Sequence, residues 1–242
     1  EPETNTVADL IPQILPGSAD EFRLLTDAVG EKGYRQIDIN LGCPFPMIAG
    51  KHKGAGMLLY PAQVAEVLAP IAEYPEIQFS LKMRLGWENA SECMVLVELL
   101  NTLRLSRIAL HARTGKQQYK GHPDLEAFQG FYELCQHPLY YNGDIESLSD
   151  IRQILTRFPL LKGVFIGRGL LSSPLLAKEF KGNETFLPEQ RMSIYFAFHE
   201  ELFSAYSQVL QGETQLLVKM KTLWEYFLPE TDRKLLKRIK KS

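Results

Sequence analysis

The chain places a cysteine at the end of an apolar segment. Residues 37–44 read Ile-Asp-Ile-Asn-Leu-Gly-Cys-Pro, and Ile37 and Ile39 alternate as in a short buried strand that ends at the glycine and the proline. A thiol at the mouth of a strand is placed to meet a ligand. Most free cysteines are small buried apolar residues, so the reactive and the structural interpretation of Cys43 are equally open at this point.

Charged side chains end the next two apolar segments. Lys82 and Arg84 lie at the end of one, and His111 and Arg113 lie at the end of the next. A lysine is costly to bury at a strand end without an anionic partner, such as a substrate or a cofactor. Lys82 and Arg84 occupy alternating positions, which predicts that one side chain faces inward and the other outward. Because two strand ends share this layout, a core histidine without function is the weaker interpretation of His111.

Glycine-containing turns follow the last two apolar segments. One reads Asn142-Gly143-Asp144, and the other reads Gly167-Arg168-Gly169. Glycines let backbone N–H groups approach a phosphate, and the N-terminus of a following helix adds a favourable dipole. The two turns are therefore a candidate phosphate site.

These segments belong to a repeated pattern in which a strand is followed by a helix. Such a repeat predicts a parallel sheet with right-handed crossovers. No strand is followed by Gly-x-Gly-x-x-Gly, and the functional side chains follow many strands, which favours a TIM (β/α)₈ barrel over an open Rossmann sheet. The predicted strands are near 11–15, 37–41, 78–83, 107–112, 138–142 and 163–166, and the predicted helices are near 20–29, 61–73, 90–103, 123–135 and 147–158.

Six strands are two fewer than such a barrel needs. We therefore expect its first two strands to lie upstream of Glu1, and the domain formed by residues 1–182 to be the rest of the barrel. The phosphate site of these barrels often follows strands seven and eight. With two strands upstream, the two glycine turns follow those strands.

Residues 183–242 are expected to form a separate helical domain. The pattern predicts helices near 188–210 and 215–227 and a third from about Glu230 to the end. Eight Lys and Arg lie between Lys219 and Lys241 against three acidic residues. A solvated helix face is the ordinary interpretation of such a run, and contact with nucleic acid is the alternative.

The bulk composition excludes several classes of protein. The 242 residues carry a formal net charge of −2, so contact with nucleic acid must come from a local patch. The three cysteines are too few for a disulfide framework, and none has the Cys-x-x-Cys spacing of a zinc site; Cys93 and Cys135 are expected to be structural. No apolar run has membrane-spanning length and no signal peptide is present, which predicts a cytoplasmic protein without membrane contact.

Five motifs together resemble those of the tRNA-dihydrouridine synthases, flavoenzymes that reduce uridine in tRNA. They occur in the order and at about the spacing of that family, between about residue 11 and residue 175. The motifs are residues 38–44, Lys82-Met-Arg84-Leu-Gly86-Trp87, His111-Ala-Arg113-Thr114 with Gln118-Tyr119-Lys-Gly121, Asn142-Gly143-Asp144-Ile145 and Ile166-Gly167-Arg168-Gly169.

The resemblance implies a barrel that binds FMN. Gln13 and Lys82 are then expected to contact the isoalloxazine, and His111 to lie beside it. The phosphate is expected at the backbone of Asn142, Gly143 and Asp144 and at that of Gly167 and Arg168.

The resemblance also implies the substrate side of the site. Asn40 is expected to position a flipped-out uracil, and Arg113 and Tyr119 to line the substrate side. Hydride passes from the reduced flavin to C6, and Cys43 is expected to give a proton to C5 from the opposite face. NADPH is the expected reductant, the basic helices are expected to bind tRNA, and a monomer is expected.

The sequence departs from the family pattern in two places. The usual opening Ala-Pro-Met strand is absent, and Phe45-Pro46 follows the cysteine where a small residue and often a lysine are expected; the segment 45–56 is expected to be a glycine-rich basic loop. Two alternatives stay open: an FMN barrel that acts on a free small molecule, of the dihydroorotate or dihydropyrimidine type, and a non-catalytic tRNA-binding relative. The basic helices argue against the first, and Cys43, Lys82 and His111 together argue against the second.

Overall fold

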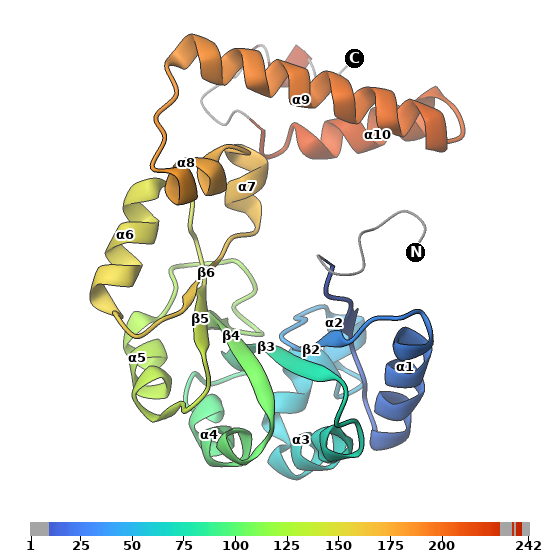
Figure 1. The fold of residues 1–242 in the computed structure, drawn as a ribbon, viewed down its shortest axis with the longest axis vertical. Coiled ribbons are helices and arrows are strands. Elements are labelled where there is room, and N and C mark those ends of the chain that lie inside the picture. The colour runs from blue at the N-terminus through green and yellow to red at the C-terminus, as the bar shows by residue number, and fades with distance from the viewer. Residues whose placement is uncertain (1–9, 228–233, 235, 239–242) are drawn as a thin grey trace. The chain divides into compact units, whose positions relative to one another are not determined.

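The computed structural model describes residues 10–227, 234 and 236–238 (Figure 1). The chain divides into two compact units. The first holds Glu1–Gly143 and Ile154–Phe165, and the second holds Asp144–Gln153 and Ile166–Ser242.

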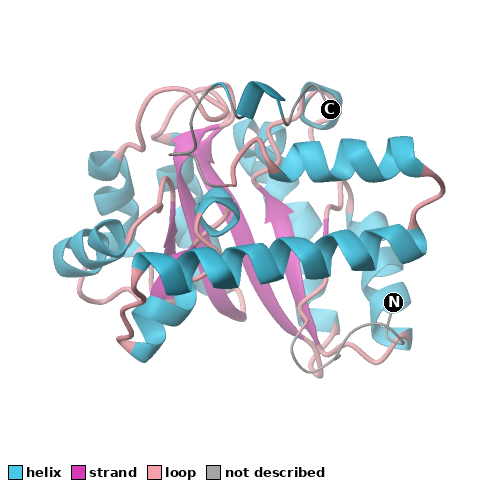
Figure 2. Ribbon diagram, turned by 90° about the horizontal axis from the view of Figure 1, so that it is seen from above, coloured by secondary structure: helices cyan, strands magenta, loops and turns pink. Residues whose placement is uncertain are grey.

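The first unit is built on one parallel sheet of six strands in the order of the sequence (Figure 2). Each strand pairs in parallel with the next, so every connection is a crossover. All six predicted strands are present, which confirms the α/β class with a parallel sheet. They are β1 (Gln13–Ile14), β2 (Gln36–Leu41), β3 (Gln78–Gly86), β4 (Leu105–Thr114), β5 (Leu139–Asn142) and β6 (Gly163–Phe165).

Helices fill the crossovers. Ser18 caps the first of them, its hydroxyl accepting a hydrogen bond from the backbone N–H of Glu21, and Asp124 caps α5 in the same way. The helices are α1 (Ala19–Glu31), α2 (Pro46–Ala49), α3 (Pro61–Leu68), α4 (Glu92–Thr102), α5 (Leu125–Leu134) and α6 (Leu148–Arg157), of which α6 contains a boundary between the units.

Two prolines explain where the predicted elements differ from the observed ones. The helix predicted over residues 61–73 ends as an α-helix at Leu68 and continues as a 3₁₀ helix, because Pro70 lacks the N–H that an α-helix needs. The prediction of a loop over residues 45–56 is wrong. Pro46 begins α2, where its missing N–H costs nothing, and a 3₁₀ helix (Gly54–Leu59) follows.

The sheet has one apolar face and one polar face. The ring centroids of Phe79 and of Phe22 in α1 lie 5.2 Å apart, and those of Tyr141 and of Phe128 in α5 lie 5.1 Å apart. Phe79 and Tyr141 therefore face the helices. The helices α1, α3, α4 and α5 lie along this face (Figure 1). Side chains alternate between the faces of a strand. The residues next to these positions therefore lie on the other face, which carries Asp38, Asn40, Ser80, Lys82, Arg84, Arg107, His111 and Asn142.

The second unit is helical in its described part. Its apolar core consists of Leu175, Tyr195, Met220, Leu223 and Phe227, and the Tyr195 and Phe227 rings lie 5.6 Å apart. The two long helices agree with those predicted. The helices are α7 (Arg168–Ser172), α8 (Leu176–Gly182), α9 (Pro188–Val209) and α10 (Glu213–Leu223).

The predicted boundary between residues 182 and 183 stays a prediction. The second compact unit already includes residues 144–153 and 166–182 together with the C-terminal helices. Of the predicted third helix, Lys234 and residues 236–238 are described and are helical, and the other residues lie outside the described part.

A partly buried ion pair ties α8 to α9 within the second unit. Glu179 is 4% exposed, and the Arg191 guanidinium donates to both of its carboxylate oxygens. Arg191→Met leaves this carboxylate buried and unpaired, so we expect it to lower the free energy of unfolding by about 3 kcal/mol. Urea unfolding of the full chain measures the change.

Lys178 provides the matched control on α8. Its ammonium lies 3.8 Å from Glu184, and both side chains are exposed. Lys178→Met should change the free energy of unfolding by less than about 0.5 kcal/mol, because exposed ion pairs contribute little. Equal effects of Arg191→Met and Lys178→Met would show that burial does not strengthen the Arg191 pair.

Candidate functional site

The turn that carries Cys43 follows β2 directly and is held on both sides. The Asn40 side-chain oxygen accepts hydrogen bonds from the backbone N–H groups of Gly42 and Cys43, both at 2.9 Å. Arg84 Nε donates to the Gly42 carbonyl at 3.0 Å, and the Ala55 N–H donates to the Cys43 carbonyl at 3.0 Å. The half-buried thiol therefore sits on a fixed backbone at the end of a central strand.

Gly54 lets a second segment approach this turn closely. Its φ is +57°, and a Cβ at this position would lie 2.8 Å from the Cys43 carbonyl oxygen. A larger residue would therefore displace the turn, which explains the glycine in the segment after Cys43.

A chain of polar contacts supports Asn40. The Ser80 hydroxyl donates to Asp38 at 2.6 Å, Gln13 Nε2 donates to the other Asp38 oxygen at 2.6 Å, and Asn40 Nδ2 donates to Gln13 Oε1 at 2.7 Å. The buried Asp38 thus orients both amides across β1, β2 and β3. Sequence reasoning missed Asp38 and Ser80, although an acid inside an apolar strand was the available signal. The predicted contacts of Gln13 with a flavin and of Asn40 with uracil stay predictions.

Lys82 and Arg84 lie on the same face of β3, so the prediction that they face opposite ways is wrong. Residues two apart in a strand share a face. Burial and the neighbouring positive charge of Arg84 lower the pKa of Lys82, while Asp38 and Cys43 act in the opposite direction. The cation therefore lies on the polar face among the groups that hold the Cys43 turn.

Arg84 is 2% exposed, and within the described part of the chain its hydrogen bonds go to main-chain oxygens. Besides Gly42, its Nη1 donates to the carbonyls of Thr114 and Gln118, each at 2.8 Å. The Tyr119 ring centroid lies 5.6 Å from the guanidinium carbon. Burial lowers the pKa of Arg84 to about 10, which still leaves the group charged at neutral pH.

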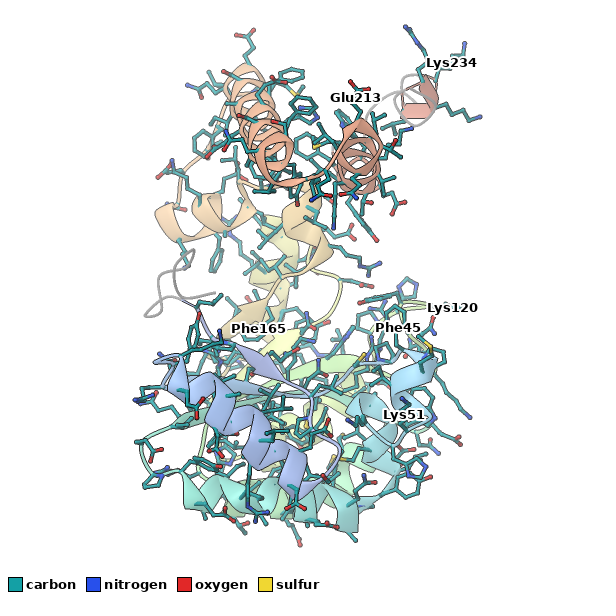
Figure 3. All side chains as sticks on the ribbon, turned by 90° about the vertical axis from the view of Figure 1, so that its right-hand side faces the viewer. Phe45, Lys51, Lys120, Phe165, Glu213 and Lys234 are labelled. Atoms are coloured by element: carbon teal, nitrogen blue, oxygen red, sulfur yellow. The ribbon has the colours of Figure 1, made fainter. Side chains whose placement is uncertain are left out.

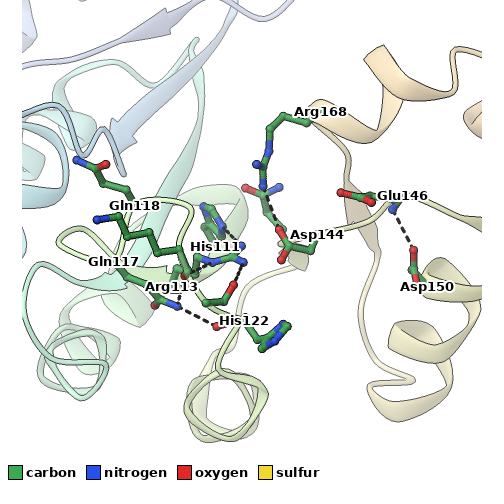
Figure 4. A network of polar contacts seen from close by, with 12 residues as sticks. His111, Arg113, Gln117, Gln118, His122, Asp144, Glu146, Asp150 and Arg168 are labelled. Atoms are coloured by element: carbon green, nitrogen blue, oxygen red, sulfur yellow. Dashed lines mark hydrogen bonds and ion pairs between the residues drawn. The ribbon is translucent and has the colours of Figure 1, made fainter. Parts of the chain in front are cut away.

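His111 and Arg113 lie at the end of β4, and both are buried. Arg113 Nη2 donates to the Gly121 carbonyl at 2.7 Å, and Nη1 lies 3.5 Å from His111 Nε2 (Figure 4). The His111 ring centroid lies 6.3 Å from that of Tyr119. The structure thus brings His111, Arg113 and Tyr119 together, and their roles toward a flavin and a substrate stay predictions.

The surface near the Cys43 turn exposes apolar and basic side chains. Phe45 is 66% exposed and Tyr119 is 57% exposed. Figure 3 shows Phe45, Lys51 and Lys120 at the surface of the first unit. Exposed aromatic rings interspersed with cations are typical of surfaces that bind single-stranded nucleic acid.

The boundary between the units falls inside the first glycine turn, after Gly143, and the second glycine turn lies in the second unit. In the first unit Asn142 Nδ2 donates to the Phe165 carbonyl at 2.9 Å. In the second unit Arg168 forms an ion pair with Asp144 at 3.1 Å, drawn in Figure 4. A Cβ on Gly169 would lie 2.0 Å from the Ile145 carbonyl oxygen, so only glycine fits there. Phosphate binding by residues 142–144 and by Gly167 and Arg168 stays a prediction.

The other two thiols belong to Cys93, which lies in α4, and to Cys135, which directly follows α5. Cys93 is fully buried in α4, and burial raises its pKa to about 12. Burial also raises the pKa of Cys135, whose thiol lies 3.8 Å from the His137 carbonyl. These positions agree with the structural role predicted for both.

The described residues include neither a metal-binding cluster nor a membrane-spanning helix. They contain no group of three or more His, Cys, Asp or Glu side chains that could hold a metal ion. Among the described helices none combines the length and the apolar character that crossing a membrane requires.

Comparison with protein families gives one match over nearly the whole chain. Residues 2–240 match the family described as Dihydrouridine synthase (Dus). The tRNA-dihydrouridine synthase B of Vibrio vulnificus is 28% identical over 174 residues, which are 69% of this chain and 54% of that protein. The probable tRNA-dihydrouridine synthase of Rhizobium leguminosarum is 32% identical over 139 residues, 57% of this chain and 44% of that protein. The chain thus spans about half the length of the curated relatives it matches.

Two solved structures share the fold at low sequence identity. Morphinone reductase aligns with a TM-score of 0.52 and 14% identity over 72% of this chain and 51% of its own. Histamine dehydrogenase from Rhizobium sp. 4-9 aligns with a TM-score of 0.52 and 16% identity over 68% of this chain and 27% of its own. This likeness supports the TIM-barrel type predicted for the sheet and its helices, and it concerns the fold alone.

Proposed function

We propose, since this chain belongs to the dihydrouridine synthase family, that its polar sheet face is part of the active site of an enzyme that reduces uridine in tRNA to dihydrouridine. One observation carries the proposal: the Cys43 turn, fixed by Asn40 and Arg84, shares that face with the partly buried cation of Lys82. A proton donor and a cation whose charges influence each other suit a reaction that develops negative charge and then takes up a proton.

The donor set of this face fits a flavin such as FMN. In the described part of the chain, Lys82 forms neither an ion pair nor a hydrogen bond with another residue. A half-buried ammonium of this kind needs an acceptor. The pyrimidine edge of an isoalloxazine offers carbonyl oxygens and becomes anionic on reduction. We assign Lys82 and Gln13 to that edge and His111 to its side.

The side chains then have separate tasks. FMN, when bound, supplies the hydride that uracil accepts at C6. The Cys43 thiol gives its proton to C5, which requires the thiol to face the base from the side opposite the flavin. Lys82 stabilises negative charge at the cofactor edge. Arg113 and Tyr119 line the substrate side, where Tyr119 offers an exposed ring for stacking.

The remaining parts of the proposal concern the reductant, the phosphate and the RNA. NADPH is the reductant of the flavin, and the backbones of residues 142–144 and of residues 167–168 are each candidates to bind the FMN phosphate. Residues 183–242 bind tRNA as the domain that orients it. The target uridine must leave its base stack, at a cost of a few kcal/mol in a stacked site and less in an open loop.

Flavin binding is the direct test of this assignment. The purified full chain should turn yellow on incubation with FMN and release the flavin on denaturation. Lys82→Met should weaken FMN binding by about tenfold or more, because one buried donor is lost. Protein that stays colourless and does not quench FMN fluorescence at micromolar concentrations contradicts the proposal.

Charge reversal tests the contribution of the C-terminal helical residues to tRNA binding. Lys237 and Arg238 are both exposed. Replacing both by glutamate should weaken tRNA binding by about tenfold at low salt and lower the salt dependence, because two phosphate contacts are lost. NADPH oxidation by the flavoprotein should not change. The exposed Lys162 of the first unit serves as control, and Lys162→Glu should bind tRNA normally. If reversal of Lys237 and Arg238 has no effect, this basic surface is only solvated.

A further inference from the structure

A single buried guanidinium joins two segments that belong to different crossovers. Arg84 Nε donates to the carbonyl of Gly42 in the Cys43 turn, and Nη1 donates to the carbonyls of Thr114, the last residue of β4, and of Gln118 in the segment that follows. We call residues 114–121, which carry Tyr119, the Tyr119 loop. Among the described backbone hydrogen bonds, none links residues 42–45 directly to this loop. Arg84 therefore forms a polar connection between the two.

We propose that Arg84 is a positioning residue that couples the Tyr119 loop to the Cys43 turn, so that the thiol is held in place when the loop is closed. This inference rests on the proposed function for its meaning in catalysis. A substrate that stacks on Tyr119 would order the loop, and the loop would in turn fix the proton donor. Binding and proton transfer would then be linked through one side chain.

The geometry requires arginine. The planar guanidinium presents its N–H groups in a fixed fork, and three carbonyl oxygens from two segments occupy that fork at 2.8–3.0 Å. A lysine ammonium is a compact donor on a flexible stem and cannot span the same three acceptors. Lys at this position keeps the charge but breaks the connection.

The Tyr119 loop is also held by hydrogen bonds that do not involve Arg84. Its shape and its connection to the Cys43 turn therefore depend on different contacts. Arg113 binds the Gly121 carbonyl, and the Gln117 side chain binds the carbonyls of Lys120 and His122 (Figure 4). Gln118 has a φ of +52°, a conformation that a side chain adopts at some cost. The loop is thus held in one shape, but none of these contacts reaches the Cys43 turn.

Two rates measured on the ligand-free full chain test the coupling. One is alkylation of Cys43 by iodoacetamide, followed on the Cys43 peptide by mass spectrometry. The other is tryptic cleavage after Lys116 and Lys120, which lie in the Tyr119 loop. Arg84→Lys should raise both rates at least about fivefold, because cleavage and alkylation follow local opening.

Arg107→Met is the matched control. Arg107 lies on the same face of the sheet, and its buried Nε has no hydrogen-bond partner among the described residues. This variant also removes a guanidinium from the polar face, but it leaves the Arg84 bonds intact. Both rates should stay within about twofold of the wild-type rates. Cleavage after the exposed Lys181 serves as an internal reference for general unfolding.

The coupling is overturned if Arg84→Lys speeds tryptic cleavage of the loop but leaves the alkylation rate of Cys43 unchanged. It is also overturned if neither rate changes. If Arg84→Lys does not fold, Tyr119→Ala replaces it, since this side chain is 57% exposed. The coupling then predicts that both rates rise together. Neither rate needs flavin or tRNA, so a failed coupling is distinguishable from a failed function.

In active protein, Arg84→Lys should lower kcat at least about fivefold with little change in KM for tRNA, as expected when a proton donor is misplaced.

Discussion

Cys43→Ala should lower the turnover of the enzyme on tRNA by about 100-fold or more, because a positioned general acid contributes that much to a proton transfer. FMN binding should not change, since Asn40 and Arg84 hold the turn through its backbone. Single-turnover mixing of reduced protein with unmodified tRNA measures the effect. Flavin absorbance reports hydride transfer, and mass spectrometry reports dihydrouridine.

Cys135→Ala is the control for loss of a thiol. Cys135 is half-buried at the end of α5, and its thiol lies 3.8 Å from the His137 carbonyl oxygen. Its turnover should stay within about twofold of the wild-type value. Unchanged turnover in Cys43→Ala would exclude the thiol as the proton donor and leave the turn with a structural role only.

Lys82→Met should have opposite effects on catalysis and on stability. Loss of the cation should lower the rate of uridine reduction by about 100-fold, as expected when a buried electrostatic donor is removed. In ligand-free protein the same change removes a partly buried charge. We therefore expect it to raise the free energy of unfolding by about 1 kcal/mol at neutral pH.

The lowered pKa of Lys82 also predicts how the free energy of unfolding changes with pH. The pKa of Lys82 in the folded chain lies below its ordinary value, mainly because of burial. Between the two pKa values the unfolded chain binds more protons, so the free energy of unfolding rises with pH through that range. Subtracting the Lys82→Met curve from the wild-type curve isolates this slope. A Lys82→Met protein that is both less stable and fully active would contradict the assignment.

The sequence located the strands well because apolar alternation and turn residues mark their ends. Cys43, Lys82, His111 and Asn142 follow or end strands as expected, and the structure places them on one parallel sheet. The orientation of Lys82 and Arg84 was predicted wrongly. The two residues are two positions apart in one strand, and because side chains alternate with a period of two, both lie on the same face.

Other features depend on contacts between distant segments. The Asp38 network needs the register that places Gln13 and Ser80 beside Asp38, and pattern alone does not determine that register. Arg84 was grouped with the charged residues that end strands, and its three acceptors are backbone oxygens of two separate segments. Carbonyl partners leave no trace in residue type, so sequence patterns could not reveal them.

The most direct test of the proposed function is a map of dihydrouridine in tRNA from cells that lack the gene. We expect dihydrouridine to disappear from at least one tRNA position, to return when the wild-type gene is restored, and to stay absent when the Cys43→Ala gene is supplied. Retention of dihydrouridine at every position in the deleted cells would contradict the account.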